Sequence, residues 1–537
     1  MTLAKIFPQA VDVPPEFVAP KVGCRVLING EISEWTGACE EVVSPLWLRE
    51  RVDAEAIPTV LGKTPYVTPE VALQALAAAR AAWQLGAGRW PTMRVEERIE
   101  SVERFLAVMI AERERICRLL MWEIAKTWPD AQAEFDRTVQ YVRDTVEALK
   151  ELDRMGSRLQ FKQGVIAQVR RAPLGVTLCL GPFNYPLNET FTTLIPTLIM
   201  GNPVVMKLPR YGVLLWEPLL EAFRDCFPPG VVNVINGEGK EIVPPMMRTG
   251  DIDVLAFIGS ARAANAIKAA HPQLNRLRGI LGLDAKNPGI ILPDADIPTT
   301  VAECVKGSLS YNGQRCTALK MIFVHESIAD RFIADFAAAV NRLPNGFPWL
   351  ENVKLTPLVE KDKPVRMHAY VAEALAKGAR LANEEGDTSY ATAYHPAVLA
   401  GVTPAMKIYC EEQFGPIVPI AVVRDPQEFI DYIIESNYGQ QASIFGQDAA
   451  TIGRLVDVLA NQVCRININT QCQRGPDIFP FTGRKDSAEG TLSISDALRC
   501  FSIRSMVAAP HTPAGKRVVR AIIDGDYSNF LNTDMIM

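Results

Sequence analysis

The order of apolar and polar residues predicts long helices in the first third of the chain. Residues 69–86 read PEVALQALAAARAAWQLG, and residues 94–127 carry apolar positions at helical spacing with charged residues between them. This spacing is typical of amphipathic helices that bury one face. The first 60 or so residues contain prolines and short strand-like pieces such as CRVLING, so we expect an irregular arm there.

From Gly175 the pattern changes to short apolar runs separated by helical segments. The runs are, in chain order, GVTLCLGPF, NPVVMKLP, GVVNVING, VLAFIGS and NPGIIL. Their alternation with helices predicts parallel β/α units and a doubly wound sheet, so the fold class is α/β. Residues 317–343 read as a strand followed by a helix, which opens a second α/β region.

Residues 172–206 carry a single charge, Glu189, and a hydropathy scan alone would suggest a membrane span. The stretch contains five prolines and the breaks GPFNYP and MGNP. A continuous spanning helix is therefore not expected, and we predict two buried strands joined by a helix. We expect no membrane association.

Two segments with alternating residues predict exposed strands, at residues 158–175 and 490–509. Exposed strands offer unpaired backbone groups to another chain, so a homo-oligomer is expected. Beyond about residue 509 the chain is expected to be weakly structured apart from AGKRVVRAII.

Charge and cysteine content exclude several classes of protein. The 56 basic and 61 acidic side chains give a net charge of -5, which argues against nucleic acid as a partner. The beginning of the chain shows no secretory signal, so the cytoplasm is the expected location. Eleven cysteines without a CxxC pair and five histidines outside metal-ligand spacing predict reduced thiols, with no disulfide framework and no metal site.

Cys316 differs from the other cysteines in its setting. It follows Arg315 within YNGQRCTALK, a segment that Asn312 and Gly313 mark as a loop. A cation next to a partly exposed thiol stabilises the thiolate and makes it a better nucleophile. Taken alone, Cys316 could equally be a loop cysteine without a role.

Five motifs in register accompany Cys316, namely GPFNYP at 181–186, VVMKLPR at 204–210, FIGS at 257–260, GQRCT at 313–317 and EEQFGP at 411–416. In order and spacing they resemble the aldehyde dehydrogenase superfamily, from about residue 60 to 505. The resemblance implies a Rossmann-type cofactor domain, an α/β catalytic domain and a small β oligomerisation arm. We assign 1–150 and 174–285 to the cofactor domain, 286–485 to the catalytic domain, 151–173 and 486–508 to the arm, and 509–537 to a C-terminal tail.

The resemblance also implies roles for single residues. Cys316 would attack an aldehyde, and Asn184 would donate a hydrogen bond to the oxyanion that forms. Ser260 would contact a dinucleotide pyrophosphate at a helix N-terminus, while Lys207 and Glu412 would hold ribose hydroxyls and Phe414 would pack near the nicotinamide. Taken singly, Asn184 could be a turn residue, and Lys207 and Glu412 could be solvated charges.

Cofactor choice and the general base depend on positions where relatives differ. Arg210 stands three residues after Lys207, where many NAD-using relatives have a glutamate, and a guanidinium there favours NADP over NAD. The general-base glutamate of the family is absent, because Gly282 occupies its place in GILGLDAKNPG. Asp284 is the candidate substitute; alternatively it makes a local hydrogen bond only.

Within the superfamily, the sequence most resembles the non-phosphorylating NADP-dependent glyceraldehyde-3-phosphate dehydrogenases. That resemblance implies a small phosphorylated aldehyde, whose phosphate would be held by charge-assisted donors at Arg137, Tyr185, Arg315 and Arg474. The expected product is 3-phosphoglycerate, formed through a thioester and water, in a homodimer or homotetramer. Two alternatives are another anionic semialdehyde or an acyl acceptor such as coenzyme A. A third is a nucleotide-binding protein with impaired turnover.

Overall fold

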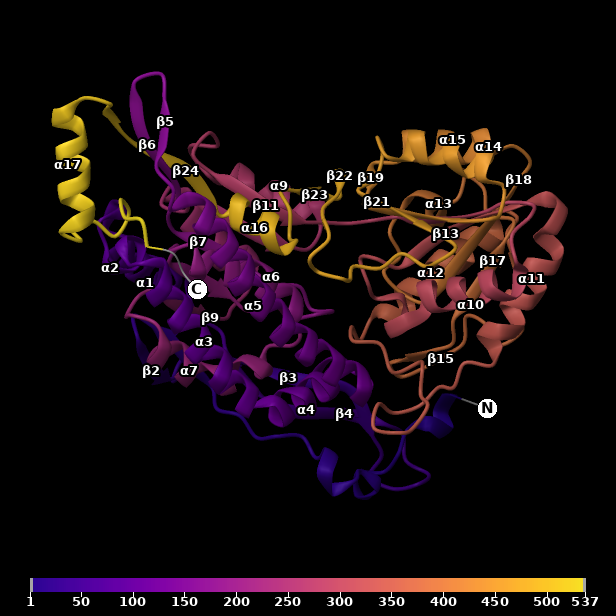
Figure 1. Ribbon diagram of the computed structural model, residues 1–537. Coiled ribbons are helices and arrows are strands. Elements are labelled where there is room, and N and C mark those ends of the chain that lie inside the picture. Colours follow the sequence, from indigo (N-terminus) through magenta and orange to yellow (C-terminus); the bar gives the residue numbers. More distant parts are fainter. Residues whose placement is uncertain (1–2, 535–537) are drawn as a thin grey trace.

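The computed structural model describes residues 3–534, which form two lobes, each built around its own sheet (Figure 1). Five parallel strands form the centre of the first sheet, and antiparallel strands close both of its edges. In spatial order its strands are β2 (Glu31–Glu34), β1 (Arg25–Ile28), β9 (Val232–Ile235), β8 (Val204–Lys207), β7 (Thr177–Leu180), β10 (Val254–Ile258), β11 (Arg278–Gly282) and β23 (Ala488–Glu489).

The second sheet is parallel except at one edge, where β14 runs antiparallel to β17. Its strands are, in spatial order, β14 (Arg380–Leu381), β17 (Ala397–Ala400), β18 (Ile417–Val423), β13 (Leu319–His325), β12 (Asn287–Ile291), β20 (Gln441–Phe445) and β21 (Arg465–Ile468). Both sheets have the parallel strands that the apolar runs predict, which confirms the α/β fold class.

Helices cover both faces of each sheet and bury its apolar side chains. One face of the first sheet packs against α3 (Val95–Ala111), α4 (Arg113–Ile124), α5 (Trp128–Gly156) and α6 (Asn188–Ile199), and the other against α1 (Pro69–Trp83), α8 (Gly239–Arg248) and α9 (Ala261–Ala269). One face of the second sheet packs against α10 (Ile297–Leu309) and α11 (Glu326–Asn341). Its other face packs against α12 (Lys363–Ala376), α14 (Pro426–Glu435) and α15 (Ala449–Leu459).

The apolar stretch of residues 172–206 folds as predicted, with β7 and β8 joined by α6. Every residue of α6 is buried, including Glu189. A helix that is buried on all sides carries few charges, which explains why the stretch resembles a membrane span in its hydropathy. None of the helices among residues 3–534 combines the length and apolar character needed to cross a membrane. A cytoplasmic location stays a prediction.

A three-stranded antiparallel sheet projects from the first lobe as an arm (Figure 1), made of β5 (Gln160–Lys162), β6 (Val165–Pro173) and β24 (Ser502–Pro510). The last strand of the arm, β24, begins later than the segment 486–508 that was predicted for the arm. β23 pairs with β11 in the first sheet, and α16 (Ile494–Cys500) packs its apolar residues into the core of the first lobe. Alternation along 490–509 did not reveal this helix, because a seven-residue helix is too short to impose a period.

The end of the chain is more ordered than the sequence suggests. The predicted helix is α17 (Pro513–Asp524), and the residues after it return to the first lobe. Arg94 pairs with Asp526 and Asp534, and the Gln168 side chain donates to the backbone oxygen of Asn532. Side-chain contacts to residues several hundred positions away hold this segment, so local composition could not predict it.

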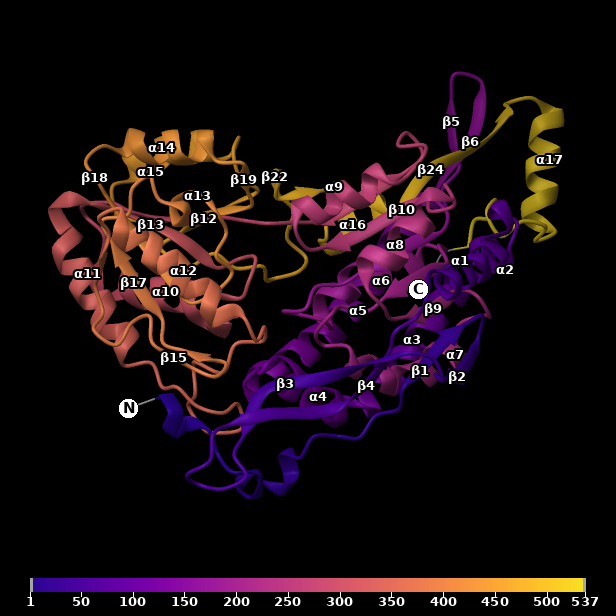
Figure 2. The ribbon, with the colours of Figure 1, turned by 180° about the vertical axis from the view of Figure 1, so that it is seen from behind.

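The N-terminal arm joins the two lobes, as Figure 2 shows from behind, where the first residues lie beside the second lobe. Its long hairpin consists of β3 (Cys39–Leu48) and β4 (Ile57–Pro65). The hydroxyl of Thr392 donates to the backbone oxygen of Pro45, and Phe7 packs against Phe347.

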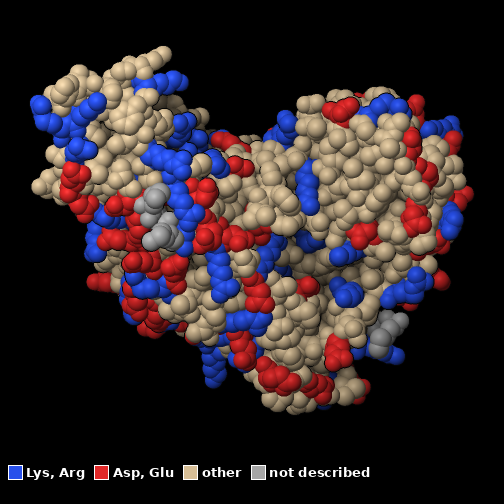
Figure 3. Space-filling view, viewed as in Figure 1, with Lys and Arg blue, Asp and Glu red and all other residues tan. Residues whose placement is uncertain are grey.

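Charged side chains of both signs are interspersed over most of the face in Figure 3, whose outline is notched between the two lobes. Basic side chains gather at the upper left, over the arm and α17, where Lys516, Arg517 and Arg520 are exposed. On the face shown, acidic side chains gather below this basic group, and the net charge of the whole chain is only -5.

Candidate active site

Cys316 lies in a tight connection between α10 and β13 and packs against the core of the first lobe. Tyr311 and Asn312 have positive φ values of 52° and 54°, so the chain reverses sharply before the cysteine. The backbone oxygen of Cys316 accepts hydrogen bonds from Asn287 Nδ2 at 2.7 Å and from Lys320 Nζ at 2.8 Å. These two donors fix the peptide that follows the thiol, and fixed geometry is what a nucleophile needs.

Asn184 comes to the same connection from the loop between β7 and α6. Its side chain is only 5% exposed, and its Nδ2 donates to the backbone oxygen of Gln314 at 2.9 Å. An amide NH₂ has two hydrogens, so a second donor remains for a ligand. The structure therefore brings together the two residues that the sequence predicts to act on an aldehyde.

Lys320 and two carboxylates form what we call the lysine cluster, made of Lys320, Glu412 and Asp284. Lys320 is 1% exposed, and its Nζ lies 2.6 Å from Glu412 Oε1. Burial and Glu412 raise the pKa of Asp284 to about 6. Burial also raises the pKa of the Cys316 thiol, and the positive charge of Lys320 opposes that rise. Sequence reasoning missed Lys320, because a lysine in an apolar strand gives no sign of where it points.

Asp284 does not contact the thiol directly in this structure. Its Oδ2 accepts a hydrogen bond from the backbone N–H of Ala261 at 2.7 Å, at the first residue of α9. Through Glu412 it is linked to Lys320, which contacts the backbone of Cys316. The local hydrogen bond considered as the alternative is thus present, and the role of Asp284 as a base stays a prediction.

Gly282 ends β11, and the space where its side chain would stand is occupied. A Cβ at this position would lie 3.2 Å from Leu492 Cδ1 and 3.5 Å from Ile258 Cγ1. A larger residue here would require the end of the Leu492 side chain to shift by a few tenths of an ångström. The position thus carries no carboxylate and is packed against Leu492.

Two of the predicted cofactor residues, Lys207 and Ser260, lie at the carboxyl ends of strands of the first sheet, which we call its cofactor edge. Lys207 is the last residue of β8, and Ser260 follows β10 and caps α9, where its Oγ accepts from Ala263 N at 3.2 Å. Carboxyl ends of parallel strands and helix N-termini are where dinucleotides bind in α/β sheets. Burial lowers the pKa of Lys207 to about 8, and its ammonium has no hydrogen bond or ion pair with any residue of 3–534. An unpartnered cation at this edge fits a nucleotide.

Two further cofactor candidates differ in how firmly they are held. Phe414 packs edge-on against Phe183 with ring centroids 5.8 Å apart, which connects the Glu412 loop to the loop of Asn184. Arg210 is exposed, and its guanidinium lies 5.4 Å from the ring of Tyr211. Arg210 is thus free to reach a phosphate near the end of β8.

Four residues form what we call the arginine network: Arg137, Asp477, Arg474 and Glu189. Arg137 binds Asp477 through two hydrogen bonds of 2.8 and 2.7 Å, and Arg474 binds Asp477 at 3.1 Å and also pairs with Glu189. Two guanidinium groups face two carboxylates, so the network is electrically balanced. The sequence predicts both arginines as phosphate ligands, and the structure brings them together with carboxylates already bound.

The other two substrate candidates lie nearer to Cys316. The ring of Tyr185 has the ammonium of Lys126 over it at 3.2 Å, and Lys126 in turn pairs with buried Glu134. Arg315 donates to the backbone oxygen of Gly307 at 2.9 Å, and its buried Nε has no hydrogen-bond partner among residues 3–534. Arg315, next to Cys316 in the sequence, is thus held by backbone oxygens and not by a carboxylate.

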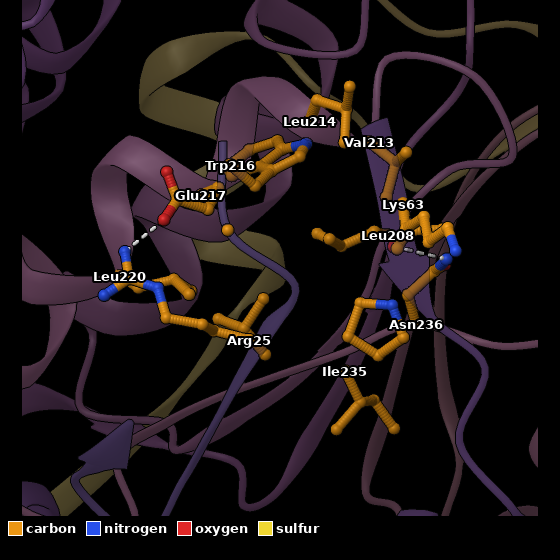
Figure 4. A pocket seen from close by; sticks show the side chains of 14 residues that line it. Arg25, Lys63, Leu208, Val213, Leu214, Trp216, Glu217, Leu220, Ile235 and Asn236 are labelled. Atoms are coloured by element: carbon orange, nitrogen blue, oxygen red, sulfur yellow. Dashed lines mark hydrogen bonds and ion pairs between the residues drawn. The ribbon is translucent and has the colours of Figure 1, made fainter. Parts of the chain in front are cut away.

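Two cavities differ greatly in size. The one in Figure 4, between Arg25, Leu208 and Trp216, holds about 20 Å³, and Arg25 points to Glu217 across it. That is room for about one water molecule, not for a nucleotide. A second cavity of about 980 Å³ opens beside the turn that leads to Cys316, with Lys306, Ser310 and Tyr311 in its wall. Its volume suits a small molecule.

Comparisons with known proteins agree with this arrangement. Residues 52–507 match the sequence model of the aldehyde dehydrogenase family. The chain is 32% identical over 494 residues to an NADP-dependent glyceraldehyde-3-phosphate dehydrogenase of Streptococcus equinus, covering 90% of this chain and 97% of that protein. It is 27% identical to a malonate-semialdehyde dehydrogenase of Bacillus cereus, covering 89% and 96%. A crystal structure of the Bacillus halodurans NADP-dependent glyceraldehyde-3-phosphate dehydrogenase with NADP superimposes with a TM-score of 0.81 at 30% identity, covering 92% of this chain and all of that one.

Proposed function

This chain belongs to the aldehyde dehydrogenase family, and we propose that it oxidises glyceraldehyde 3-phosphate to 3-phosphoglycerate with NADP. The observation that carries the proposal is the meeting of Cys316 and Asn184 in one connection, beside a sheet edge that offers an unpartnered Lys207. A relative and a solved structure that bear this activity in their names are 32% and 30% identical to the chain.

The chain's own residues supply the acylation step. The Cys316 thiolate attacks the aldehyde carbon, and the carbonyl oxygen becomes an oxyanion. The free Nδ2 hydrogen of Asn184 and the backbone N–H of Cys316 are the donors we assign to that oxyanion. Lys320 helps by stabilising the thiolate electrostatically before attack.

NADP, when bound, would accept a hydride from the substrate carbon and leave a thioester on Cys316. Lys207 and Glu412 would hold its ribose hydroxyls, Phe414 would pack near the nicotinamide, and the N-terminus of α9 at Ser260 would take the pyrophosphate. Glu412 is bound to Lys320 in this structure, so that pair must loosen if Glu412 is to accept from a ribose.

Hydrolysis of the thioester is assigned to water activated by Asp284. A carboxylate with a pKa of about 6 is mostly ionised at neutral pH and is basic enough to take a proton. One oxygen of Asp284 is engaged with Ala261 and the carboxyl also contacts Glu412, so that second contact must loosen for a water molecule to bind there.

The choice of NADP rests on Arg210, which is exposed next to Lys207. Arg210→Ala should weaken NADP binding by about 10- to 100-fold and leave NAD binding nearly unchanged, because only NADP carries the 2′-phosphate that the guanidinium pairs with. Tryptophan fluorescence titration with each nucleotide measures both. The exposed Arg224→Ala is the matched control, and equal losses for NAD and NADP would contradict the assignment.

A second candidate function follows from the arginine network and from Gly282. Because Asp477 and Glu189 balance the two arginines, a singly charged semialdehyde or an acceptor other than water fits the site as well. The relative named malonate-semialdehyde dehydrogenase supports the first variant. Gly282, which carries no carboxylate and is packed against Leu492, supports the second variant, in which coenzyme A is the acyl acceptor.

Rapid mixing separates these functions. Enzyme, NADP and glyceraldehyde 3-phosphate should give a burst of NADPH that continues into steady turnover. A burst of one equivalent that stalls, and resumes when coenzyme A is added, would favour acyl transfer. Silence with this substrate and activity with malonate semialdehyde would favour the other aldehyde. Silence with every aldehyde, despite measured NADP binding, would contradict an enzymatic role.

We also propose that the arm mediates assembly into a homodimer or homotetramer. Its apolar side chains at Phe161, Ile503 and Met506 are 61%, 51% and 64% exposed in the single chain. Exposed strands with apolar side chains are typical of subunit contacts. Sedimentation of Met506→Glu against the parent chain tests this, and an unchanged mass would argue against the arm.

A further inference from the structure

Two cysteines of the N-terminal arm lie in contact, outside residues 52–507 that match the family. Cys24 Sγ and Cys39 Sγ are 3.5 Å apart, Cys39 is exposed and Cys24 is partly exposed. Both thiols are free in the structure. Two sulfur atoms at this separation need to approach by only about 1.5 Å to reach the length of a disulfide bond.

The backbone at or beside each cysteine is held by a hydrogen bond from Trp35. Cys24 directly precedes β1, and its backbone oxygen accepts from Trp35 N at 2.8 Å. Cys39 opens β3, and the indole of Trp35 donates to Ala38 O at 2.6 Å, next to it. The same tryptophan thus fixes the chain beside each thiol, so the close approach is part of the local fold.

We propose that Cys24 and Cys39 form a dithiol site that small oxidised disulfides convert reversibly into an intramolecular disulfide. The exposed Cys39 reacts first: its thiolate attacks one sulfur of R–S–S–R and displaces RS⁻. Cys24 then loses its proton to solvent and attacks the Cys39 sulfur, which displaces the second RS⁻. The two protein thiols are oxidised to one disulfide, and the small disulfide is reduced to two thiols.

The order of the two steps follows from the surroundings of the two sulfurs. Burial and the contact with Cys39 raise the pKa of Cys24 to about 12, so Cys24 is a poor first nucleophile. Once Cys39 is bound in a mixed disulfide it carries no charge, and its contribution to that rise disappears. Burial and Glu34 still raise the pKa of Cys24, and Lys63 opposes them, so the second step proceeds because the two sulfur atoms are already in contact.

The site also borders the sheet edge assigned to the cofactor. Glu40 follows Cys39, pairs in register with Thr64, and contributes to the electrostatic environment of Lys207. Thr64 accepts a hydrogen bond from Asn236 at 3.1 Å, in the connection that follows β9. A disulfide between Cys24 and Cys39 would therefore connect the start of β1 to β3, whose residue Glu40 lies near Lys207. A link to cofactor binding rests on the proposed function, whereas formation of the disulfide does not.

The experiment treats the whole protein with glutathione disulfide, alkylates remaining thiols, and maps peptides by mass spectrometry without reduction. We expect a peptide pair joined through Cys24 and Cys39 whose mass is lower by two hydrogen atoms, and its loss after glutathione is added. Exposed Cys410 has no neighbouring thiol in the structure and should carry glutathione instead. It serves as an internal control for reagent access.

Single variants make the test specific. Cys39→Ser should abolish the joined peptides and leave Cys24 largely unmodified, whereas Cys24→Ser should leave Cys39 as a stable mixed disulfide. Cys410→Ser should form the Cys24–Cys39 disulfide like the parent chain. Glutathione on Cys39 of the parent chain without any joined peptide, while Cys410 is fully modified, would overturn the proposal. That outcome is independent of whether any aldehyde is oxidised.

Discussion

The lysine cluster and the arginine network contain similar side chains but treat charge differently. In the arginine network, Arg137 and Arg474 meet Asp477 and Glu189, and the four charges cancel. In the lysine cluster, Lys320 faces two carboxylates, Glu412 and Asp284, and the pKa of Asp284 is raised to about 6. Perturbed pKa values mark groups suited to proton transfer, whereas balanced ion pairs mainly hold a structure together.

The number of arginines near a site therefore does not give the net positive charge of that site. Arg137, Arg315 and Arg474 look equivalent in the sequence as phosphate ligands. In the folded chain Arg137 and Arg474 are bound to carboxylates, whereas Arg315, next to Cys316 in the sequence, bonds to backbone oxygens and to Gln471 and has no carboxylate partner among residues 3–534. We expect substitutions in the lysine cluster to change the rates of thiol attack and hydrolysis, and substitutions in the arginine network to change substrate affinity.

The largest effect should follow from removing the thiol next to the lysine cluster. Cys316→Ser should lower NADPH formation by at least about 10⁴-fold in both the burst and the steady state, because no covalent intermediate can form. Stopped-flow absorbance measures both phases. Cys464→Ser, a half-buried cysteine outside the site, should behave like the parent enzyme, and a surviving burst in Cys316→Ser would refute the role of the thiol.

Asp284→Asn should slow steady turnover by on the order of 10²- to 10⁴-fold while the burst keeps its amplitude, because only the water step needs the base. For the parent enzyme, the steady rate should fall as the pH drops below about 6, where Asp284 becomes protonated. Exposed Asp335→Asn is the control. Loss of the burst together with the steady rate would place Asp284 in cofactor binding instead of hydrolysis.

Lys320→Met should reduce the reactivity of the Cys316 thiol by roughly 10-fold at pH 7, because its positive charge no longer stabilises the thiolate. The rate of alkylation by iodoacetamide, followed by peptide mapping, measures this without any substrate. Lys354→Met, which replaces an exposed lysine, should leave the rate unchanged. An unaltered rate in Lys320→Met would show that the cluster does not tune the thiol.

Glu189→Gln should have the smallest effect and the opposite sign. The arginine network would gain one net positive charge, and the KM for glyceraldehyde 3-phosphate should fall several-fold with kcat little changed. Glu147→Gln, on the exposed face of α5, is the control. An unchanged KM would mean that the network is structural and that Arg315 alone meets the phosphate.

Predictions from sequence were most successful where local pattern decides the outcome. The apolar runs became strands of two parallel sheets, and residues 172–206 became β7, α6 and β8. The short α16 and the ordered segment after α17 were missed, since neither depends on a long periodic pattern. Glu189 was visible as the single charge in an apolar stretch, but nothing nearby indicated its partner.

The sequence by itself determined the fold class and the family and gave Cys316 as the candidate nucleophile, because strand and helix periods are local and because five motifs occur in a fixed order. Only the tertiary structure decided which charges cancel, that Leu492 packs against Gly282, and that Cys24 meets Cys39. Arg474 and Glu189 are 285 positions apart, and Arg137 and Asp477 are 340 apart. Contacts over such separations depend on how whole sheets pack, and a reading of neighbouring residues cannot supply that geometry.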